Sequence, residues 1–242
     1  MNYQKLDILA IGVHPDDVEL SCGGTIAKEI YLGKKVGVLH LTEGELGTRG
    51  SNEIRLKEAD KASKILGIHV QEFLNIGDGF FETTENNLRK IGIILRKYRP
   101  DIVLLNAVND RHPDHARAST LCSRACFLSG LSKVELYDKN GNSLKKWRPS
   151  QVYHYIQWKN LTPDFVVDIT GFMEIKKNAC LAYASQFYNE KSDEPETLVS
   201  SKNFLDSIEY RAKDLGRIIG VEHAEGFTVE RFVGVDNLSH LI

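Results

Sequence analysis

Residues 6–13 have the sequence LDILAIGV, and residues 14–19, HPDDVE, follow them directly. The first stretch is an almost unbroken apolar run that is too short for a typical helix, and Pro15 ends it. Such a run predicts a strand of a parallel sheet that is buried on both faces. Gly23-Gly24 allow tight packing at the start of a helix that we expect over residues 21–32. The stretch therefore predicts a strand, a polar turn and a helix, the repeating unit of an α/β fold.

Strand and helix patterns alternate along the rest of the chain. Further strands are predicted at 35–41, 71–74, 101–105, 152–157 and 165–169, and the segment at 101–105 (DIVLL) is of the same buried type as the first. Apolar residues at helical spacing predict helices at 51–66, 86–98, 115–128, 172–184 and 202–219. The fold class is therefore α/β, with a mostly parallel sheet covered by helices on both faces. We expect residues 185–201 to form a long loop and residues 1–242 to form a single domain.

The composition argues against several classes of function. Of the 242 residues, 42% are hydrophobic, and the formal net charge is −2. No basic cluster suits a nucleic acid or an anionic membrane as a partner. The N-terminus lacks a signal-peptide pattern, and no apolar run reaches the roughly 18 residues of a membrane span, so we expect a cytoplasmic protein. The four cysteines form no CxxC pair, and we expect them to pack as small buried hydrophobes.

Polar clusters follow three of the predicted strands. His14-Pro15-Asp16-Asp17 follows the first strand, residues 42–50 (TEGELGTRG) follow the second, and residues 109–115 (NDRHPDH) follow the fourth. Ligands of parallel α/β sheets bind beyond the carboxyl ends of the strands. Either His-Pro-Asp cluster alone could consist of solvated residues that cap helices. Two such clusters at separate strand ends of one sheet predict a shared functional site.

The residue types in these clusters suit catalytic zinc. Two imidazoles and one carboxylate, with a fourth position open, form a known catalytic zinc arrangement. His14 and Asp17 lie three residues apart across the strand-to-helix turn, and the spacing leaves both His112 and His115 as the third ligand. Asp16, next to a ligand, is the natural general base for a water molecule that the metal acidifies. The remaining imidazole could stabilise an oxyanion.

Other chemistries lack their motifs. No GxGxxG follows the first strand, the chain has no GxSxG, and Ser21-Cys22-Gly23-Gly24 lacks the Gly-Lys-Ser/Thr ending of a phosphate loop. Metal-assisted hydrolysis is therefore the favoured reaction class. A non-catalytic module that binds a sugar or a metal would use the same ligands. Such a module does not require the second carboxylate, Asp16, so its presence favours an enzyme.

At these residues the sequence resembles the LmbE-like (PIG-L) N-acetylglucosamine deacetylases. The matching motifs are GVHPDDVE at 12–19, GGTIA at 23–27 and DRHPDH at 110–115. The resemblance continues through AYASQF at 182–187 to AEGF at 224–227. It implies a Rossmann-like α/β domain, and because relatives are often hexameric it also implies a homo-oligomer.

The resemblance also implies roles for individual residues. Asp16 would act as the general base and then as the acid that protonates the leaving amine. His112 would stabilise the oxyanion, and Asp114 would orient an imidazole from behind. The metal, Zn²⁺ or another divalent ion such as Fe²⁺, would have three protein ligands: His14, Asp17 and His115.

Within the family, the loop at 42–50 and Asp110-Arg111-His112 are most similar to the branch of bacillithiol biosynthesis. Members of that branch deacetylate N-acetylglucosaminyl malate and release acetate. Guanidinium groups are well suited to hold the malate carboxylates, and the candidates are Arg49, Arg55 and Arg111. Arg55 could equally belong to a solvated helix face or pair with a nearby Glu. The alternative substrate is another small GlcNAc conjugate or a chitooligosaccharide.

One position departs from the family pattern. Some members have a tyrosine two residues before the HPDH motif as an extra polariser of the carbonyl, and this chain has Asp110 there. A replacement would have to come from elsewhere, with Tyr183 and Tyr188 as candidates. Core packing or loop anchoring is the more ordinary role of such tyrosines.

Overall fold

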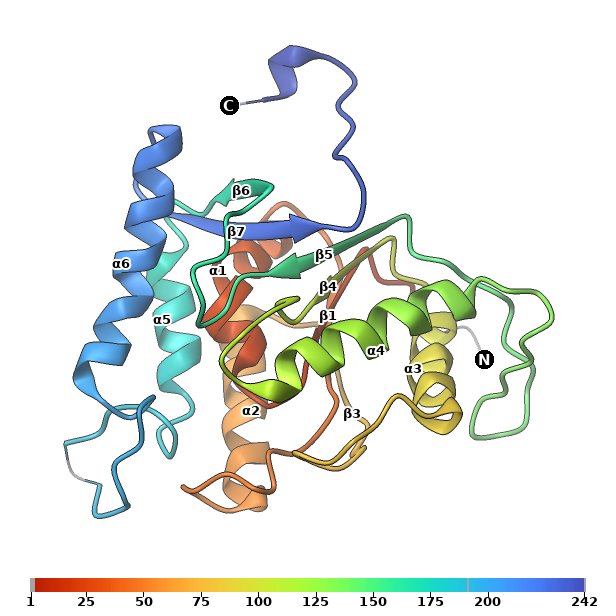
Figure 1. The fold of residues 1–242 in the computed structure, drawn as a ribbon, viewed down its shortest axis with the longest axis horizontal. Coiled ribbons are helices and arrows are strands. Elements are labelled where there is room, and N and C mark those ends of the chain that lie inside the picture. Colours follow the sequence, from red (N-terminus) through yellow and green to blue (C-terminus); the bar gives the residue numbers. More distant parts are fainter. Residues whose placement is uncertain (1–2, 191, 242) are drawn as a thin grey trace.

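The computed structural model describes residues 3–190 and 192–241 (Figure 1). Within them, seven strands form one sheet in the order β3-β2-β1-β4-β5-β7-β6. The strands are β1 (Ile8–Gly12), β2 (Val36–His40), β3 (Val70–Phe73), β4 (Ile102–Leu105), β5 (Gln151–Tyr155), β6 (Phe165–Asp168) and β7 (Ala224–Val229). Strands β1 to β5 pair in parallel, whereas β7 pairs antiparallel with both β5 and β6. The predicted α/β fold with a mostly parallel sheet is confirmed.

Helices cover both faces of this sheet, with α3 and α4 in front of it in Figure 1 and α1 and α2 behind. Ile8 and Ala10 of β1 belong to the core beneath α1, α2, α5 and α6. Leu9 and Ile11 belong to the other core, beneath α3 and α4, because successive residues of a strand point to opposite faces. The helices are α1 (Asp17–Tyr31), α2 (Asn52–Leu66), α3 (Glu85–Tyr98), α4 (Pro113–Ser129), α5 (Met173–Leu181) and α6 (Lys202–Ile219).

Strand β7 is an element that the sequence pattern did not predict. Its sequence, AEGFTV, contains Glu and Gly, which are depleted in strands. The strand forms because the buried carboxylate of Glu225 is fully paired. Lys176 Nζ lies 2.6 Å from Glu225 Oε1, and the Gly24 and Thr25 N–H groups donate to the same carboxylate at 3.0 and 2.7 Å. A buried ion pair is tolerated when such hydrogen bonds complete it.

Helix α1 begins at Asp17, four residues earlier than expected, and its backbone is non-helical at Cys22. The interruption frees N–H groups in the next turn, and the Glu225 carboxylate accepts two of them. The helix also packs closely against Ile169, the residue that follows β6. A Cβ atom on Gly24 would lie only 2.6 Å from Ile169 Cδ1, so a larger residue would not fit there without a shift. The expected close packing of the first helix at its glycine pair is therefore confirmed at Gly24.

The remaining expectations about burial agree with the structure. In the described part of the chain, none of the helices has the length and apolarity needed to cross a membrane. The cysteines are all free and buried, as expected of core residues: Cys22, Cys122, Cys126 and Cys180.

Candidate active site

The carboxyl ends of β1 and β4 lie side by side at the centre of the sheet, with β2 on the other side of β1. Loops at this edge, together with α6, line a cavity of about 430 Å³. The predicted loops after β1, β2 and β4 all contribute, and residues after β3 and β5 join them. The predicted site residues that line the cavity are His14, Asp16, Asp17, Arg49, Arg55, Arg111, His112 and His115.

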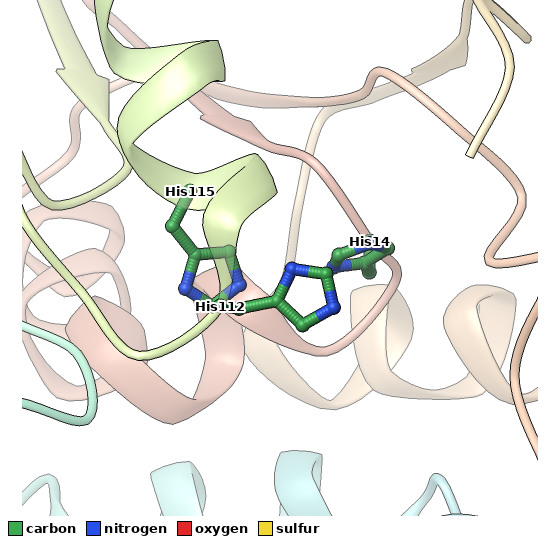
Figure 2. Close-up of side chains that lie close together, drawn as sticks. All are labelled: His14, His112 and His115. Atoms are coloured by element: carbon green, nitrogen blue, oxygen red, sulfur yellow. The ribbon is translucent and has the colours of Figure 1, made fainter. Parts of the chain in front are cut away.

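Three imidazoles point toward one another in this cavity (Figure 2). His14 lies in the loop after β1, His112 is the N-cap of α4, and His115 lies in the first turn of that helix. Helix α4 begins at Pro113, two residues earlier than expected, because proline is well suited to a first turn. The ring centroid of His14 lies 4.8 Å from that of His112 and 5.8 Å from that of His115. One nitrogen of each ring lies within 4.8 Å of the others, a spacing that could hold a metal ion.

The carboxylate of Asp17 lies against two of these rings. Its Oδ1 is 3.0 Å from His115 Nε2, and its Oδ2 is 3.7 Å from His14 Nδ1. Asn106 Nδ2 and Gln157 Nε2 each donate to it at 3.0 Å. Burial opposes its ionisation, but the neighbouring imidazoles, above all His115, hold the pKa of Asp17 well below its usual range. The carboxylate is therefore rigidly placed and charged.

In His14 and His115, the ring nitrogen that points away from Asp17 lies next to another carboxylate. His14 Nε2 lies 2.9 Å from Asp78 Oδ1, and His115 Nδ1 lies 2.6 Å from Asp110 Oδ2. These contacts leave His14 Nδ1 and His115 Nε2 directed at Asp17. Burial lowers the pKa of His115, but Asp17 and Asp110 overcome it and raise that pKa to about 10. His14, Asp17 and His115 would offer a divalent cation two imidazole nitrogens and one carboxylate, which are donor types that zinc prefers.

Replacing Asp110 by Asn is expected to weaken the binding of a divalent cation by about 10- to 100-fold. The imidazole of His115 would lose its charged acceptor, while the remaining side-chain oxygen could still accept the Lys159 N–H, now bound at 2.8 Å. Competition against a chromophoric chelator measures the affinity. Asp60→Asn, at an exposed ion pair on α2, is the matched control. An unchanged affinity in Asp110→Asn would contradict this role.

Asp16 lies in the cavity in a strained backbone conformation. Its φ of 112° is rare for a residue with a side chain, and such strain is held only where surrounding structure enforces it. Arg55 provides this support: its Nη2 donates to Pro15 O at 2.9 Å and lies 3.5 Å from Asp16 Oδ2. Burial raises the pKa of Asp16 to about 6, and Arg55 opposes the shift. A carboxylate of this kind can both accept and return a proton near neutral pH.

The ring of His112 can donate a hydrogen bond from its Nε2 atom. Its Nδ1 accepts the Asp114 N–H at 3.3 Å, so the neutral ring carries its proton on Nε2. Burial, followed by the charges of His14 and His115, lowers the pKa of His112. The ring therefore stays neutral at neutral pH and can donate a hydrogen bond from Nε2.

The role predicted for Asp114, orienting an imidazole from behind, stays a prediction. Its carboxylate is fully buried and accepts the Gly79 N–H at 2.9 Å and an Arg117 N–H at 3.0 Å. Its Oδ2 lies 3.9 Å from His14 Nε2, beyond hydrogen-bond distance. Asp114 joins α4 to the loop after β3, and Asp78 and Asp110 lie within hydrogen-bond distance of the imidazoles.

The three predicted arginines differ in what they bind. Arg49 is buried and bonds Ser192 Oγ at 2.7 Å and Glu194 Oε2 at 3.3 Å, so it anchors the loop at 185–201. Arg55 is buried and donates to Gly44 O at 3.1 Å as well as to Pro15 O, so the solvated-face alternative is wrong. A side chain at Gly44 would collide with this guanidinium. Arg111 alone is exposed, and its guanidinium lies 5.1 Å from the Trp158 ring centroid.

Sequence reasoning missed Asp78 and Gln157. Asp78 lies between two glycines after β3, and Gln157 lies just past the end of β5. Applying the strand-end rule to all five parallel strands would have found both. The two tyrosines considered as polarisers do not line the cavity. Tyr183 is fully buried and donates to Glu19 Oε1 at 3.1 Å, so core packing describes it, and Tyr188 is 39% exposed.

Comparisons with known proteins agree with the motifs and with the fold. The family model described as PIG-L, GlcNAc-PI de-N-acetylase, matches residues 9–126. Diacetylchitobiose deacetylase from Thermococcus kodakarensis is 33% identical over 190 residues, which cover 74% of this chain and 70% of the relative. The solved structure of the conserved protein TT1542 from Thermus thermophilus has a TM-score of 0.85 and 33% identity, covering 96% of this chain and 98% of that one.

A second solved structure, N,N'-diacetylchitobiose deacetylase from Pyrococcus horikoshii, has a TM-score of 0.78 and 27% identity, covering 97% of this chain and 88% of that one. The chain therefore belongs to the PIG-L (LmbE-like) family of deacetylases, as its motifs predicted. Members of this family are metal-dependent deacetylases, so the chain is an enzyme rather than a non-catalytic binding module.

Proposed function

We propose that the chain removes the N-acetyl group of N-acetylglucosaminyl malate, using Zn²⁺ held by His14, Asp17 and His115. The observation that carries the proposal is the carboxylate of Asp17 lying against two imidazoles whose outer nitrogens are each held by another carboxylate. A divalent cation bound there would supply the charge that polarises the amide carbonyl and acidifies water. Fe²⁺ shares these donor preferences and is the second candidate.

The chain's own residues provide the proton transfers of amide hydrolysis. Asp16 accepts a proton from the attacking water and returns it to the nitrogen as the C–N bond breaks. The Nε2–H of His112 donates to the carbonyl oxygen as negative charge develops on it. The products are acetate and the free amine of the glucosamine conjugate.

Removing the metal is expected to abolish acetate release, and adding one equivalent of Zn²⁺ is expected to restore it. The two imidazoles and Asp17 cannot by themselves polarise the amide as strongly as a divalent ion. Elemental analysis of the purified protein should find about one divalent metal per chain. Full activity in metal-free protein would contradict the proposal, and parallel loading with Fe²⁺ identifies which ion supports the higher turnover.

The malate conjugate is supported by Arg111, the only one of the three predicted arginines that is exposed at the cavity. A chitooligosaccharide is the second candidate, because the similar proteins from Thermococcus kodakarensis and Pyrococcus horikoshii are diacetylchitobiose deacetylases. Rates with N-acetylglucosaminyl malate, free GlcNAc and diacetylchitobiose distinguish them. Equal rates on all three would refute the malate assignment and leave the deacetylase intact.

We also propose that the whole chain acts as one catalytic domain and assembles as a homo-oligomer. The first point is supported by a cavity whose lining extends from His14 to Gly226. The second is supported by the family resemblance, and sedimentation velocity measures the assembly directly.

A further inference from the structure

Four arginines line the cavity: Arg49, Arg55, Arg111 and Arg211. Two of them already have a carboxylate of the protein beside them, because Arg49 pairs with Glu194 and Arg55 lies 3.5 Å from Asp16. The lysine of the lining, Lys176, is likewise paired with Glu225. These cations are therefore neutralised within the fold.

The other two arginines have no such partner. Neither Arg111 nor Arg211 lies within 4.0 Å of a carboxylate oxygen of residues 3–190 or 192–241. Both contact the same residue, Trp158. The Arg111 guanidinium lies 5.1 Å from its ring centroid, and Arg211 Nη2 donates to its carbonyl oxygen at 2.7 Å. The arginines without a carboxylate partner thus lie at two parts of one residue, Arg111 at the ring of Trp158 and Arg211 at its backbone carbonyl.

Trp158 is held in place by a stack of aromatic rings. Its ring lies 5.4 Å from that of Phe204, at an interplanar angle of 11°, and Phe204 lies 6.2 Å from Phe187 at 7°. Phe204 belongs to α6, and Phe187 is buried in the core. The stack therefore fixes the position from which Trp158 supports Arg111, which reduces the entropy lost when that guanidinium binds a ligand.

The environment favours a singly charged oxyanion over a doubly charged one. The buried carboxylate of Asp110, next to Arg111 in sequence, faces His115, and its charge also acts on Arg211. A carboxylate is repelled less by this aspartate than a phosphate, which carries about −1.5 to −2 charges. A guanidinium matches the planar carboxylate with two parallel hydrogen bonds.

We propose that Arg111 and Arg211, both positioned by Trp158, form a subsite that binds a carboxylate on the aglycone of the GlcNAc conjugate. The inference rests on the proposed deacetylase function and adds Arg211 and Trp158 to it. Arg111 and Arg211 touch the substrate, whereas Trp158 is a positioning residue. The subsite makes the enzyme selective for acidic conjugates over neutral ones.

The test compares kcat/KM for three substrates: N-acetylglucosaminyl malate, GlcNAc 1-phosphate and methyl N-acetylglucosaminide. Wild-type enzyme should prefer the malate conjugate, and Arg211→Gln should lower that preference roughly 10- to 100-fold, mainly through KM, because a hydrogen bond to a charged group is lost. Arg111→Gln should act similarly. Trp158→Leu should lower the preference as well, and Trp158→Phe should restore part of it by rebuilding the stack.

The neutral methyl glycoside provides the internal comparison, because its kcat/KM should fall much less than that of the malate conjugate in each variant. Arg217→Gln is the matched control, because Arg217 lies in an exposed ion pair on α6, the helix that contains Arg211. This variant should leave kcat/KM unchanged for all three substrates. A wild-type enzyme that deacetylates all three substrates equally would overturn the subsite but not the deacetylase. An equal loss on neutral and acidic substrates in Arg211→Gln would reveal a purely structural role, and a preference for the phosphate would overturn the carboxylate assignment.

Discussion

Asp16→Asn should retain the metal and lose turnover, with kcat falling by about 10²- to 10⁴-fold, the usual contribution of a general base. The amide has nearly the shape of the carboxylate but cannot accept the proton of the attacking water. Asparagine also tolerates the left-handed backbone conformation at this position better than alanine does, so the strain at φ 112° is not made worse. The variant therefore separates chemistry from folding.

Three measurements on Asp16→Asn distinguish the general base from a ligand: acetate release, metal content and thermal stability. We expect one metal per chain and a melting temperature close to that of the wild type. Asp60→Asn on α2 is the same substitution at an exposed position and should leave all three values unchanged. Turnover within a factor of a few of the wild type would eliminate Asp16 as the base, and loss of the metal would instead make it a ligand.

Asp17→Asn should lose both the metal and the activity. The substitution removes the charged donor between His14 and His115, so the affinity for Zn²⁺ should fall by more than the roughly 10- to 100-fold expected when only an outer partner is lost. Asn106 and Gln157 direct their amide N–H groups at this carboxylate. In the variant, the side-chain amide N–H group introduced at position 17 can face one of these two N–H donors, which leaves a buried donor without an acceptor and weakens the metal site further.

Elemental analysis after dialysis and competition against a chelator measure the effect of Asp17→Asn. Activity should return only in part at high Zn²⁺, because the acceptor charge stays absent. His69→Ala, an exposed histidine just before β3, is a control for unspecific metal binding and should keep one metal per chain. Wild-type affinity in Asp17→Asn would show that Asp17 is not a ligand and that the metal is held by another close group, either the three imidazoles or His14 with Asp78 and Asp114.

Much of the fold followed from local patterns. The apolar runs at β1 and β4 are found as strands because central strands of a parallel sheet are buried on both faces. Strand β7 was not predicted, because Glu225 is acceptable there only once Lys176 and the N–H groups of Gly24 and Thr25 surround it. Those partners lie about 50 and 200 residues away in the sequence.

The candidate site divides in the same way. The cluster of His14, Asp16 and Asp17 could be predicted from the amino-acid sequence, because one strand-to-helix turn contains all three. Long-range packing sets which carboxylates contact His14 and His115 and which arginines of the cavity have no carboxylate partner. Asp78 reaches His14 across 64 residues, and Arg211 joins the cavity from the middle of a helix. Contacts over such separations depend on how helices and loops pack on the sheet. Local spacing in the sequence does not contain that information.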